Sequence, residues 1–486
     1  MHFIDLFEFF IYMAVMLGIG FFFLKKNKDA EDFFVGGRSM GSLHVGLSVV
    51  ATDVGGGFSI GLGGLGFVMG LSGSWMLFTG LIGAWVSAVL LIPRVNKMKS
   101  FKKLYTFPQI FEEFYNGKVA FIAGVISAIG YIGFTSSQIL AGAKLASASF
   151  VNLDMETALL IMGAIVIIYT SLGGIKAVIY TDTVQWIVLM AGLVFIGLPL
   201  GYSAIGGWSA LQKEVSNDLL SFTNVSWQTL VNWGVTIIPI WFVGMTLYQR
   251  IYSCKDEKTA KKAWFIAGLF EWPVMAMMGV MLGLFGRVAA DQGMFAYLGH
   301  PTMAGLDPEK GLPLLLRTVM PVGMMGLMMS AYFSAIMSTA DSCLMAASGN
   351  VATDILDRFF SFSSNEKRFL KLSQWLTLIL GVFSLWLASS MQNVLQLMLY
   401  SYAFMVSGLF VPVIGAFFWK RSSSLAAMWA MIIGGGTTIT LIMINTNLPF
   451  GLDPNIFGIT ASALTFLLLT YMFPNEEYLT TAEALD

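Results

Sequence analysis

The residues with the clearest chemistry are the hydroxyl and carboxyl groups near position 340. Ala335, Ser338, Thr339 and Ser342 follow the spacing i, i+3, i+4, i+7, so a helix would place them on one face, with Asp341 as their neighbour. Hydroxyl, carbonyl and carboxylate oxygens are the ligands that a hard cation prefers. The alternative is that each hydroxyl bonds to a carbonyl one turn earlier in its own helix. The pattern therefore predicts either a cation site or a locally satisfied polar face.

A second group of such residues lies in segment 51–58, which reads Ala-Thr-Asp-Val-Gly-Gly-Gly-Phe. Three consecutive glycines weaken a helix, each by about 1 kcal/mol relative to alanine. An interrupted membrane helix can direct free carbonyls at a cation and free N–H groups at a carboxylate. Close packing of helices through small residues is the other interpretation. Asp53 within the segment favours a binding site.

Acidic residues inside apolar stretches are costly in a membrane and are usually functional, although each can also be a structural group with a polar partner. Glu271 stands before Trp272-Pro273, where a kink is expected, and could serve proton coupling. The candidates are Asp53, Asp182, Glu271 and Asp341.

Aromatic residues could line a solute cavity, but in membrane proteins they more often serve packing or anchoring at the membrane interface. The three histidines do not cluster, and Cys254 and Cys343 lie far apart, so neither a zinc site nor a disulfide framework is predicted. The aromatic candidates are Phe134, Trp241, Tyr248, Tyr400 and Tyr402.

The elements that position these residues must be membrane helices. The chain has 486 residues, of which 57% are hydrophobic and 11% charged, against about 25% charged residues in soluble domains. So little charge cannot cover a soluble surface, and a net charge of -1 gives no reason to expect nucleic acid. The first apolar stretch is too long for a signal-peptide core and is expected to remain as a span. Thirteen stretches approach the length of about 20 residues that a span needs: 5–24, 41–70, 74–93, 119–146, 154–172, 178–203, 229–250, 263–286, 313–345, 369–391, 393–418, 424–445 and 454–473.

The basic residues predict the orientation of these spans. With the N-terminus outside, 22 of the 27 lysines and arginines fall on the inner side, Arg250 among them, and 4 on the outer side. Cytoplasmic loops carry such an excess. Lys144 lies near the outer end of its span and is expected to extend to the membrane surface.

The most specific motif runs from Tyr169 to Gln185. It reads YTSLGGIKAV over 169–178 and YTDTVQ over 180–185. This is similar to the YTxxGGxxAV…TDxxQ signature of the sodium:solute symporter family, with Ile175 where leucine, methionine or phenylalanine is usual. Gly36-Gly37-Arg38 and Gln249-Arg250 fit the family as well. The resemblance extends from the first predicted span to the twelfth.

The resemblance implies an all-α polytopic membrane protein with about 13 transmembrane helices. Its arrangement would be leucine-transporter-like, with two inverted five-helix repeats, one extra helix before them and two after. The expected parts of this single transport domain (1–486) are the extra helix at 5–24, the repeats at 41–203 and 229–418, the two further helices at 424–473 and a cytoplasmic tail at 474–486.

The resemblance also implies where ions and solute bind. The family's main sodium site joins the broken first core helix to the eighth core helix. Here its ligands would be the carbonyls of Ala51, Val54 and Ala335 and the hydroxyls of Ser338 and Thr339. Some members bind a second sodium, whose ligands would be Asp182, Ser338, Asp341 and Ser342, with Asp341 replacing a serine of some members. Coupling or solute contacts are expected at Asp53, Gly55, Gly56, Gly57, Phe58, Phe134, Trp241 and Tyr248.

Different parts of the chain resemble members with different solutes. Segment 155–159 and Asp53 look like proline-transporting members, whereas Ala51-Thr52, the glycine triplet and 338–342 are closer to choline-transporting members. The latter have tryptophan where Asp53 and Gly244 stand, so an aromatic cage for a quaternary ammonium would be incomplete. Sugar-transporting members have asparagine where Gly244 falls, which disfavours a sugar. Proline, another small amino acid or a related zwitterion is the first expectation.

The sequence thus predicts a secondary active transporter, not an enzyme, that couples inward sodium flux to uptake of a small organic solute by alternating access. Its expected partners are the sodium ion, the solute and the lipid bilayer, with no cofactor and no nucleic acid. The expected location is the cell membrane, or the inner membrane in a Gram-negative bacterium, with the C-terminus cytoplasmic. The alternatives are a proton-coupled transporter of the same fold, uptake of a quaternary amine, a membrane-embedded enzyme and a solute sensor.

Overall fold

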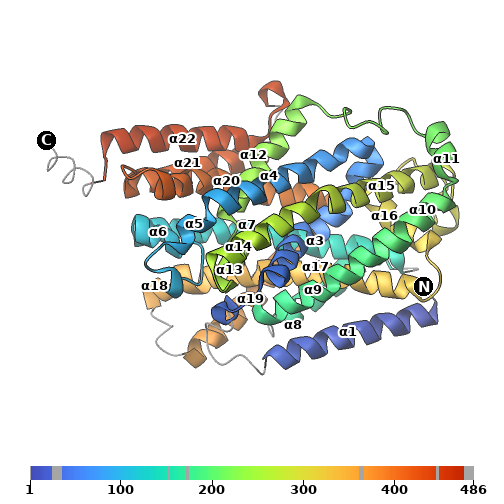
Figure 1. The fold of residues 1–486 in the computed structure, drawn as a ribbon, viewed down its shortest axis with the longest axis horizontal. Coiled ribbons are helices and arrows are strands. Elements are labelled where there is room, and N and C mark those ends of the chain that lie inside the picture. The colour runs from blue at the N-terminus through green and yellow to red at the C-terminus, as the bar shows by residue number, and fades with distance from the viewer. Residues whose placement is uncertain are drawn as a thin grey trace.

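The computed structural model describes residues 2–24, 35–150, 153–170, 175–360, 366–444 and 448–475. Within these ranges the chain is helical, and the only strand-like pairing is an isolated bridge between Met40 and Cys254. Figure 1 shows that most long helices follow the long axis of the molecule, with α1 along one edge and α22 along the other. The chain starts at one end of this bundle, and α22 finishes at the opposite end.

The helices follow the predicted spans closely. In the first half they are α1 (Phe3–Leu24), α3 (Ser42–Met69), α4 (Trp75–Leu90), α5 (Ile92–Asn96), α6 (Gln109–Phe114), α7 (Gly117–Ser149), α8 (Met155–Thr170), α9 (Ile175–Gly192), η4 (Leu193–Gly197), α10 (Leu198–Ala204) and α11 (Gly207–Glu214). In the second half they are α12 (Trp227–Val243), α13 (Met245–Ser253), α14 (Glu257–Leu269), η5 (Phe270–Met275), α15 (Ala276–Asp291), α16 (Pro308–Val319), α17 (Met324–Gly349), η7 (Asn350–Leu356), α18 (Asp357–Phe360), α19 (Glu366–Ser389), α20 (Val394–Phe418), α21 (Ser424–Ile444) and α22 (Pro454–Met472).

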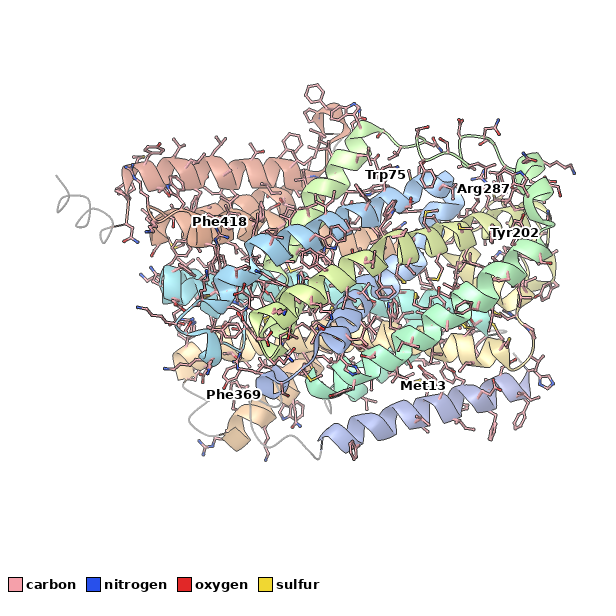
Figure 2. All side chains as sticks on the ribbon, in the orientation of Figure 1. Met13, Trp75, Tyr202, Arg287, Phe369 and Phe418 are labelled. Carbon is pink, nitrogen blue, oxygen red and sulfur yellow. The ribbon has the colours of Figure 1, made fainter. Side chains whose placement is uncertain are left out.

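Large apolar side chains cover the flanks of the bundle. Phe195 is 77% exposed and Ile168 65%, and Figure 2 marks two further exposed aromatic residues, Tyr202 and Phe418. An apolar surface this extensive belongs in lipid. In the described part of the chain, eight helices are long and apolar enough to span a membrane, or nine if the bent pair α12 and α13 is one span. The count of thirteen spans stays a prediction.

Three of the long helical runs are interrupted near their middle. In α3, Gly55 has φ 34° and ψ -158°, which confirms the break predicted from the glycine triplet. The run from α14 to α15 bends through η5, where Trp272 leaves helical geometry beside Pro273, as predicted. The third interruption, at Gly244 between α12 and α13, bends the chain by 43° and was not predicted from the sequence.

The predicted ninth span, 313–345, was too long. Its first residues belong to α16, which ends at Val319, and α17 begins only at Met324. Pro321 cannot continue a helix because it lacks the backbone N–H, and Gly323 has φ 91°. The apolar character of the connection hid this boundary, and α16 is therefore a separate short helix at one end of the bundle.

The predicted inner loops gather at one end of the bundle, which we call the basic end. The loop between α5 and α7 and the loop between α13 and α14 both lie there (Figure 1). Arg38 joins them, since its guanidinium donates to the carbonyls of Lys102 (3.0 Å) and Tyr252 (3.4 Å). The opposite end holds α11 and α16.

Glycines let α3 approach α15 closely. A Cβ atom on Gly66 would lie 2.2 Å from the carbonyl oxygen of Val280, and one on Gly283 would lie 2.0 Å from that of Gly63. Both obstacles are backbone atoms, which cannot turn aside. The two helices can therefore pack at this distance only without side chains at these positions.

We expect Gly66→Ala to destabilise the folded protein by about 1–3 kcal/mol, because the methyl group must push α15 away. The measurement is the thermal unfolding midpoint of purified protein in detergent. Gly436→Ala in α21 is the matched control, since nothing lies within 4 Å of a Cβ there, and alanine favours a helix over glycine. Equal midpoints for the two variants would contradict the close packing.

Candidate functional site

The break in α3 is held between three other helices. A Cβ on Gly55 would lie 2.8 Å from atoms of Gln138 in α7 and Thr339 in α17, and one on Gly57 would lie 2.6 Å from the sulfur of Met398 in α20. The backbone N–H of Gly56 donates to Oε1 of Gln138 at 2.7 Å. The glycines are therefore consistent both with a break that forms a binding site and with close helix packing, because they open the helix and also allow other helices to approach it.

Several residues predicted to bind the main sodium ion lie close together near this break. Thr339 Oγ1 lies 3.2 Å from the carbonyl oxygen of Ala51 and 3.1 Å from that of Ala335. Ser338, the next residue of α17, is buried beside them. Segments almost three hundred residues apart thus place two carbonyls and a hydroxyl within one small region. The side chains of Val54 and Phe58 lie outside the described residues.

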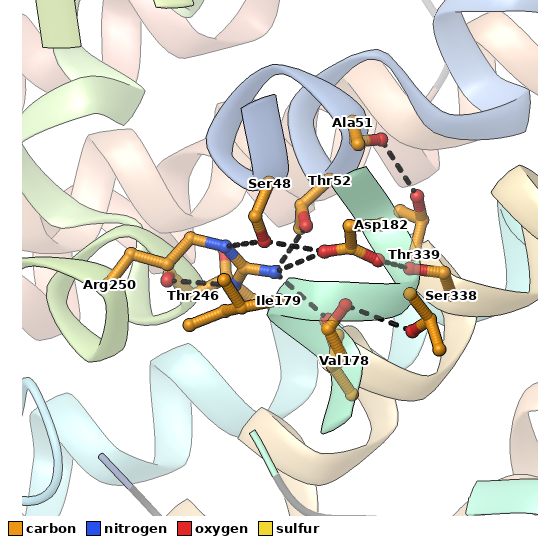
Figure 3. A network of polar contacts seen from close by, with 12 residues as sticks. Ser48, Ala51, Thr52, Val178, Ile179, Asp182, Thr246, Arg250, Ser338 and Thr339 are labelled. Atoms are coloured by element: carbon orange, nitrogen blue, oxygen red, sulfur yellow. Dashed lines mark hydrogen bonds and ion pairs between the residues drawn. The ribbon is translucent and has the colours of Figure 1, made fainter. Parts of the chain in front are cut away.

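Asp182 of α9 is the centre of a larger polar network (Figure 3). One carboxylate oxygen accepts a hydrogen bond from Ser338. The other accepts from Ser48 Oγ at 2.5 Å and from Arg250 Nη2 at 3.2 Å. Asp182 is fully buried, and its partners come from α3, α13 and α17. The acid therefore links the broken helix to the helix that carries the candidate sodium ligands.

Arg250 was wrongly assigned to a loop at the inner surface. It is 0% exposed and extends from α13 into this network. Besides Asp182, it donates to Ser48 (3.0 Å) and Thr52 (2.5 Å), and its Nη2 lies 3.4 Å from Ser342 Oγ. The guanidinium supplies a positive charge where the second sodium was predicted.

The other predicted ligands of the second sodium lie around this ion pair. Asp341 is buried, and its Oδ1 accepts a hydrogen bond from Thr170 of α8 at 2.5 Å. Ser342 faces Arg250, whereas Ser338 faces Asp182. The four predicted residues are thus neighbours, but Arg250 shares the site with them. A second sodium at this place stays a prediction.

Asp53 and two aromatic residues form a second group near the break. Tyr402 of α20 donates its hydroxyl to Asp53 Oδ1 at 3.3 Å. The ring of Phe134 meets that of Tyr402 edge to face, with centroids 5.0 Å apart. All three residues are buried. These contacts place a carboxylate and an aromatic pair next to the unwound segment, which is where a solute is expected.

Three other aromatic candidates make packing contacts. Trp241 is fully buried against Trp264 and Gly83, and Tyr248 donates to the carbonyl of Phe242 at 2.8 Å. Gln396 donates to the hydroxyl of Tyr400 at 2.7 Å near the surface. None of these described contacts is with the break in α3. A role of Trp241 and Tyr248 in solute binding stays a prediction without a contact to support it.

At the end opposite the basic end, Lys144 forms a buried ionic cluster, so the prediction that it extends to the membrane surface was wrong. Its Nζ lies 2.6 Å from both Asp307 and Glu309. Glu309 also accepts the backbone N–H groups of Val394 and Leu395, each at 3.0 Å. The cluster therefore joins α7, α16 and the N-terminus of α20.

At the basic end, Asp354 lies in η7, past the end of α17 and outside the predicted span. It is 1% exposed and accepts a hydrogen bond from Thr106 at 2.9 Å. Burial raises the pKa of this carboxyl to about 8, although the Thr106 hydrogen bond and Arg358 lower it and Glu112 raises it further. The unfolded chain loses this proton near the ordinary pKa of 3.8.

We expect Asp354→Asn to stabilise the protein increasingly as the pH rises. Between about pH 4 and about pH 8 the folded state keeps a proton that the unfolded state has lost, so wild-type stability falls by about 1.4 kcal/mol per pH unit from this group. Asparagine removes that loss. The unfolding midpoints of both proteins across this range provide the measurement, with exposed Asp218→Asn as control. A difference in unfolding midpoint between Asp354→Asn and wild type that does not change with pH would contradict the expectation.

Comparison with known proteins agrees with this geometry. Residues 33–434 match the model of the sodium:solute symporter family. The high-affinity proline transporter PutP of Bacillus subtilis is 27% identical over 469 residues, which cover 94% of this chain and 96% of the relative. The sodium/proline symporter of Escherichia coli is 28% identical over 445 residues, which cover 88% of this chain and 86% of the relative.

A solved structure supports the fold independently. The substrate-bound outward-open structure of a sodium-coupled sialic acid symporter superposes with a TM-score of 0.79, covering 98% of this chain and 99% of that one at 21% identity. Together with the two further transporter structures of lower similarity, this confirms the leucine-transporter-like fold. The boundaries of the two repeats stay a prediction, although α3 and the pair α12–α13, which would begin them, are both broken.

Proposed function

The chain belongs to the sodium:solute symporter family, and from that premise we propose that it moves sodium inward to drive the uptake of proline. The family consists of secondary transporters, so the protein is a membrane transporter and not an enzyme. Two relatives that align along most of the chain are proline transporters by name.

The observation that carries the sodium coupling is the approach of Thr339 to the broken helix. Its hydroxyl stands between the carbonyls of Ala51 and Ala335, and Ser338 lies beside it. These groups have the hard oxygen chemistry that an alkali cation prefers. They also belong to two different helices, α3 and α17, so an ion bound to both would hold the helices in one arrangement.

This arrangement explains how sodium can raise the affinity for the solute. Sodium offsets the carbonyl dipoles at the break and fixes the shape of the unwound segment, against which the solute binds. Because the coupling is reciprocal, the solute must raise the affinity for sodium by the same factor. A membrane potential of about 100 mV contributes about 2.3 kcal/mol per sodium ion from the electrical part of the gradient.

We place the basic end of the bundle in the cytoplasm of the cell. The loops that the sequence predicts to be inner contain most of the lysines and arginines, and two of these loops lie at this end. Cytoplasmic loops carry this excess. The start of α1 would then face outward and the end of α22 inward. Sodium and solute would enter from the end that holds α16 and leave at the basic end.

A small zwitterion suits the group formed by Asp53, Tyr402 and Phe134. The carboxylate can attract the ammonium group of an amino acid, and the aromatic pair offers an apolar surface to a short hydrocarbon ring. The start of the second half of α3, where the N–H of Gly56 donates to Gln138, offers the positive end of a helix dipole to the substrate carboxylate. Proline combines these three features in a molecule small enough for a closely packed site.

The test is uptake of labelled proline into liposomes that contain the purified protein, with and without an inward sodium gradient. Unlabelled amino acids, choline and sugars compete in parallel. Ser338→Ala should reduce uptake at limiting sodium by roughly 10-fold or more, the effect of removing a polar ligand of a charged group. Ser330→Ala is the matched control, since this buried serine of the same helix donates to the carbonyl of Gly326, one turn earlier in its own helix.

Each outcome has a definite meaning. Sodium-driven proline uptake that is lost in Ser338→Ala and kept in Ser330→Ala supports both the ion and the solute. Sodium-driven uptake of another competitor replaces proline but keeps the coupling. Uptake that ignores sodium in every condition overturns the proposal.

A further inference from the structure

Asp354 at the basic end is a buried acid that forms no ion pair within the described residues. It is 1% exposed, and its Oδ1 accepts a hydrogen bond from Thr106 at 2.9 Å, whereas its Oδ2 has no hydrogen-bond partner in that part of the chain. Arg358 is already engaged, since its Nε donates to the backbone carbonyl of Asp354 at 3.0 Å and its Nη2 lies 2.6 Å from Glu112. A negative charge on Asp354 would therefore be costly.

Asn350, four residues earlier in η7, has an unpaired oxygen as well. Its Nδ2 donates to Ser127 of α7 at 2.6 Å, and its Oδ1 has no donor among the described residues. Segment η7 is a π-helix, in which residues four or five apart lie on one face. Asp354 contacts the same side of α7, because a Cβ on Gly124, one turn before Ser127, would lie 2.8 Å from its Cβ. The two unpaired oxygens thus belong to neighbouring side chains of one buried interface.

A single proton would satisfy both oxygens. An ionised Asp354 and the carbonyl oxygen of Asn350 can only accept, but a proton on Oδ2 of Asp354 can be donated to Oδ1 of Asn350. The hydrogen bonds would then run without a gap from Thr106 through the two residues to Ser127, and such chains strengthen each bond. A proton also needs no room of its own, which suits an interface too close for a side chain at Gly124. The pKa of about 8 that burial gives Asp354 agrees with this chain.

The groups around Asp354 leave it as the buried carboxyl of this interface. Segment η7 packs against α7, α17, α18 and α19. Neither the contacting turn of α7 nor the last turn of α17 contains a titratable residue. Among the described groups nearby, the carboxyl groups other than Asp354 are partly or fully exposed, and the phenol is neutral at physiological pH. These titratable and charged neighbours are Glu112, Tyr252, Asp357, Arg358, Arg368 and Lys371.

The same proton would tie an inner loop to the helices. Thr106 belongs to the loop between α5 and α6, which Arg38 also holds through the carbonyls of Lys102 (3.0 Å) and Leu104 (2.9 Å). Through Asp354 this loop is joined to η7, the continuation of the helix that carries the candidate sodium ligands, and to α7. If the loop moved away, Asp354 would meet water, where a carboxyl group is ionised at neutral pH. Movement of the loop and loss of the proton are therefore linked.

We propose that Asp354 and Asn350 share one proton at the inner end of the transporter, and that opening of this end releases the proton into the cytoplasm. The inference rests on the proposed function in one respect, the placement of the basic end in the cytoplasm. An acid cytoplasm then favours a closed inner end, and an alkaline one favours opening. Turning the amide of Asn350 would instead let it donate to an ionised Asp354, and the first measurement distinguishes the two arrangements.

The first measurement is the infrared absorption of protonated carboxyl groups in purified protein, from about pH 5 to about pH 9. We expect the spectrum of wild type minus that of Asp354→Asn to contain this band at low pH and to lose it with a midpoint at about pH 8. Thr106→Val should move the midpoint upward by about one pH unit, because the lost hydrogen bond favours the ionised form. Exposed Asp218→Asn is the control and should remove no band from this range.

The second measurement is the rate at which trypsin cleaves after Lys102 or Lys103, which lie exposed in the loop. The rate in wild type divided by the rate in Asp354→Asn should rise by about tenfold per pH unit from about pH 6 to about pH 8 and then level off. Below pH 8 the closed state keeps a proton that the open state has lost, and asparagine removes this difference.

Both results are needed to support the proposal. A difference spectrum without the carboxyl band at any pH means that Asp354 is ionised and overturns it. A band accompanied by a cleavage ratio that does not change with pH overturns the link between the proton and opening. If Asp354→Asn does not fold, the shift of the midpoint in Thr106→Val tests the proton by itself, and an unshifted midpoint contradicts it. Neither measurement uses sodium or proline, so a failure here is distinct from a failure of the proposed transport.

Discussion

Arg250→Met is expected to cause one of the largest losses of stability of any single substitution in this chain. It removes the cation that neutralises Asp182 and leaves a fully buried carboxylate with hydroxyl partners only. Breaking a buried ion pair in this way costs about 3–5 kcal/mol. The unfolding midpoint of the purified protein, or its yield if it does not survive purification, provides the measurement.

Two further variants make this result specific to the ion pair. Adding Asp182→Asn to Arg250→Met should recover much of the loss, because the orphaned charge is then gone. Arg358→Met is the matched control, since Arg358 pairs with Glu112 at 2.6 Å on the surface of the basic end. An exposed pair is worth about 0–1 kcal/mol. If Arg250→Met costs no more than Arg358→Met, the buried pair is not what holds these helices together.

Lys144→Met is expected to lower the stability of the folded protein by a similar amount. This lysine lies at the end of the bundle opposite the basic end. Lys144 and Glu309 are both only 4% exposed, and the lysine is the cation placed between Glu309 and Asp307. Without it Glu309 keeps two N–H donors but loses its opposite charge, at a cost of about 3–5 kcal/mol. Thermal unfolding measures the loss, and labelling of a cysteine introduced into α16 detects whether that helix detaches from α7.

The double variant Lys144→Met with Glu309→Gln should be more stable than Lys144→Met alone, since the amide no longer needs a counter-charge. Lys213→Met provides the control, because this lysine is 81% exposed and forms an ion pair with its sequence neighbour Glu214 on the surface. A loss in Lys144→Met that the second substitution does not reduce would point to lost packing of the lysine stem instead of lost charge.

Much of the fold was predictable because it depends on local patterns. The apolar stretches located the helices to within a few residues, and the glycine triplet located the break in α3 at Gly55. These features follow from local properties of each segment, namely the length of its apolar stretch and the low helix propensity of glycine. The prediction failed where the stretch stayed apolar across a boundary, as between Val319 and Met324.

The site was less predictable because its partners are distant in sequence. Asp182 and Arg250 are 68 residues apart, and Lys144 and Glu309 are 165 apart. A basic residue at the end of an apolar stretch looks the same whether it faces water or a buried acid, so Arg250 and Lys144 were both misplaced. Gln138, which accepts the N–H of Gly56, was missed, and its only signal was an amide within an apolar helix.

Residues predicted from their side-chain chemistry differ in where they lie in the structure. Thr339 contacts the carbonyl of Ala51 in α3, and Ser338 donates to Asp182 in α9, while their role as sodium ligands stays a prediction. Trp241 and Tyr248 were equally suitable by chemistry but pack among other aromatic rings. An aromatic residue fits a core and a cavity equally well, so its type does not distinguish the two.

The placement of the two ends of the chain has a practical consequence for any vesicle experiment. Helix α1 starts at one end of the bundle and α22 finishes at the other. Reconstitution inserts molecules in both directions, and their opposing fluxes partly cancel. A protease site before α1 and a fluorescent label after α22 would be reached from different compartments. Protease added to intact vesicles and a membrane-impermeant quencher would then each measure the fractions of molecules in the two orientations. The measured uptake could be assigned to molecules of a single orientation.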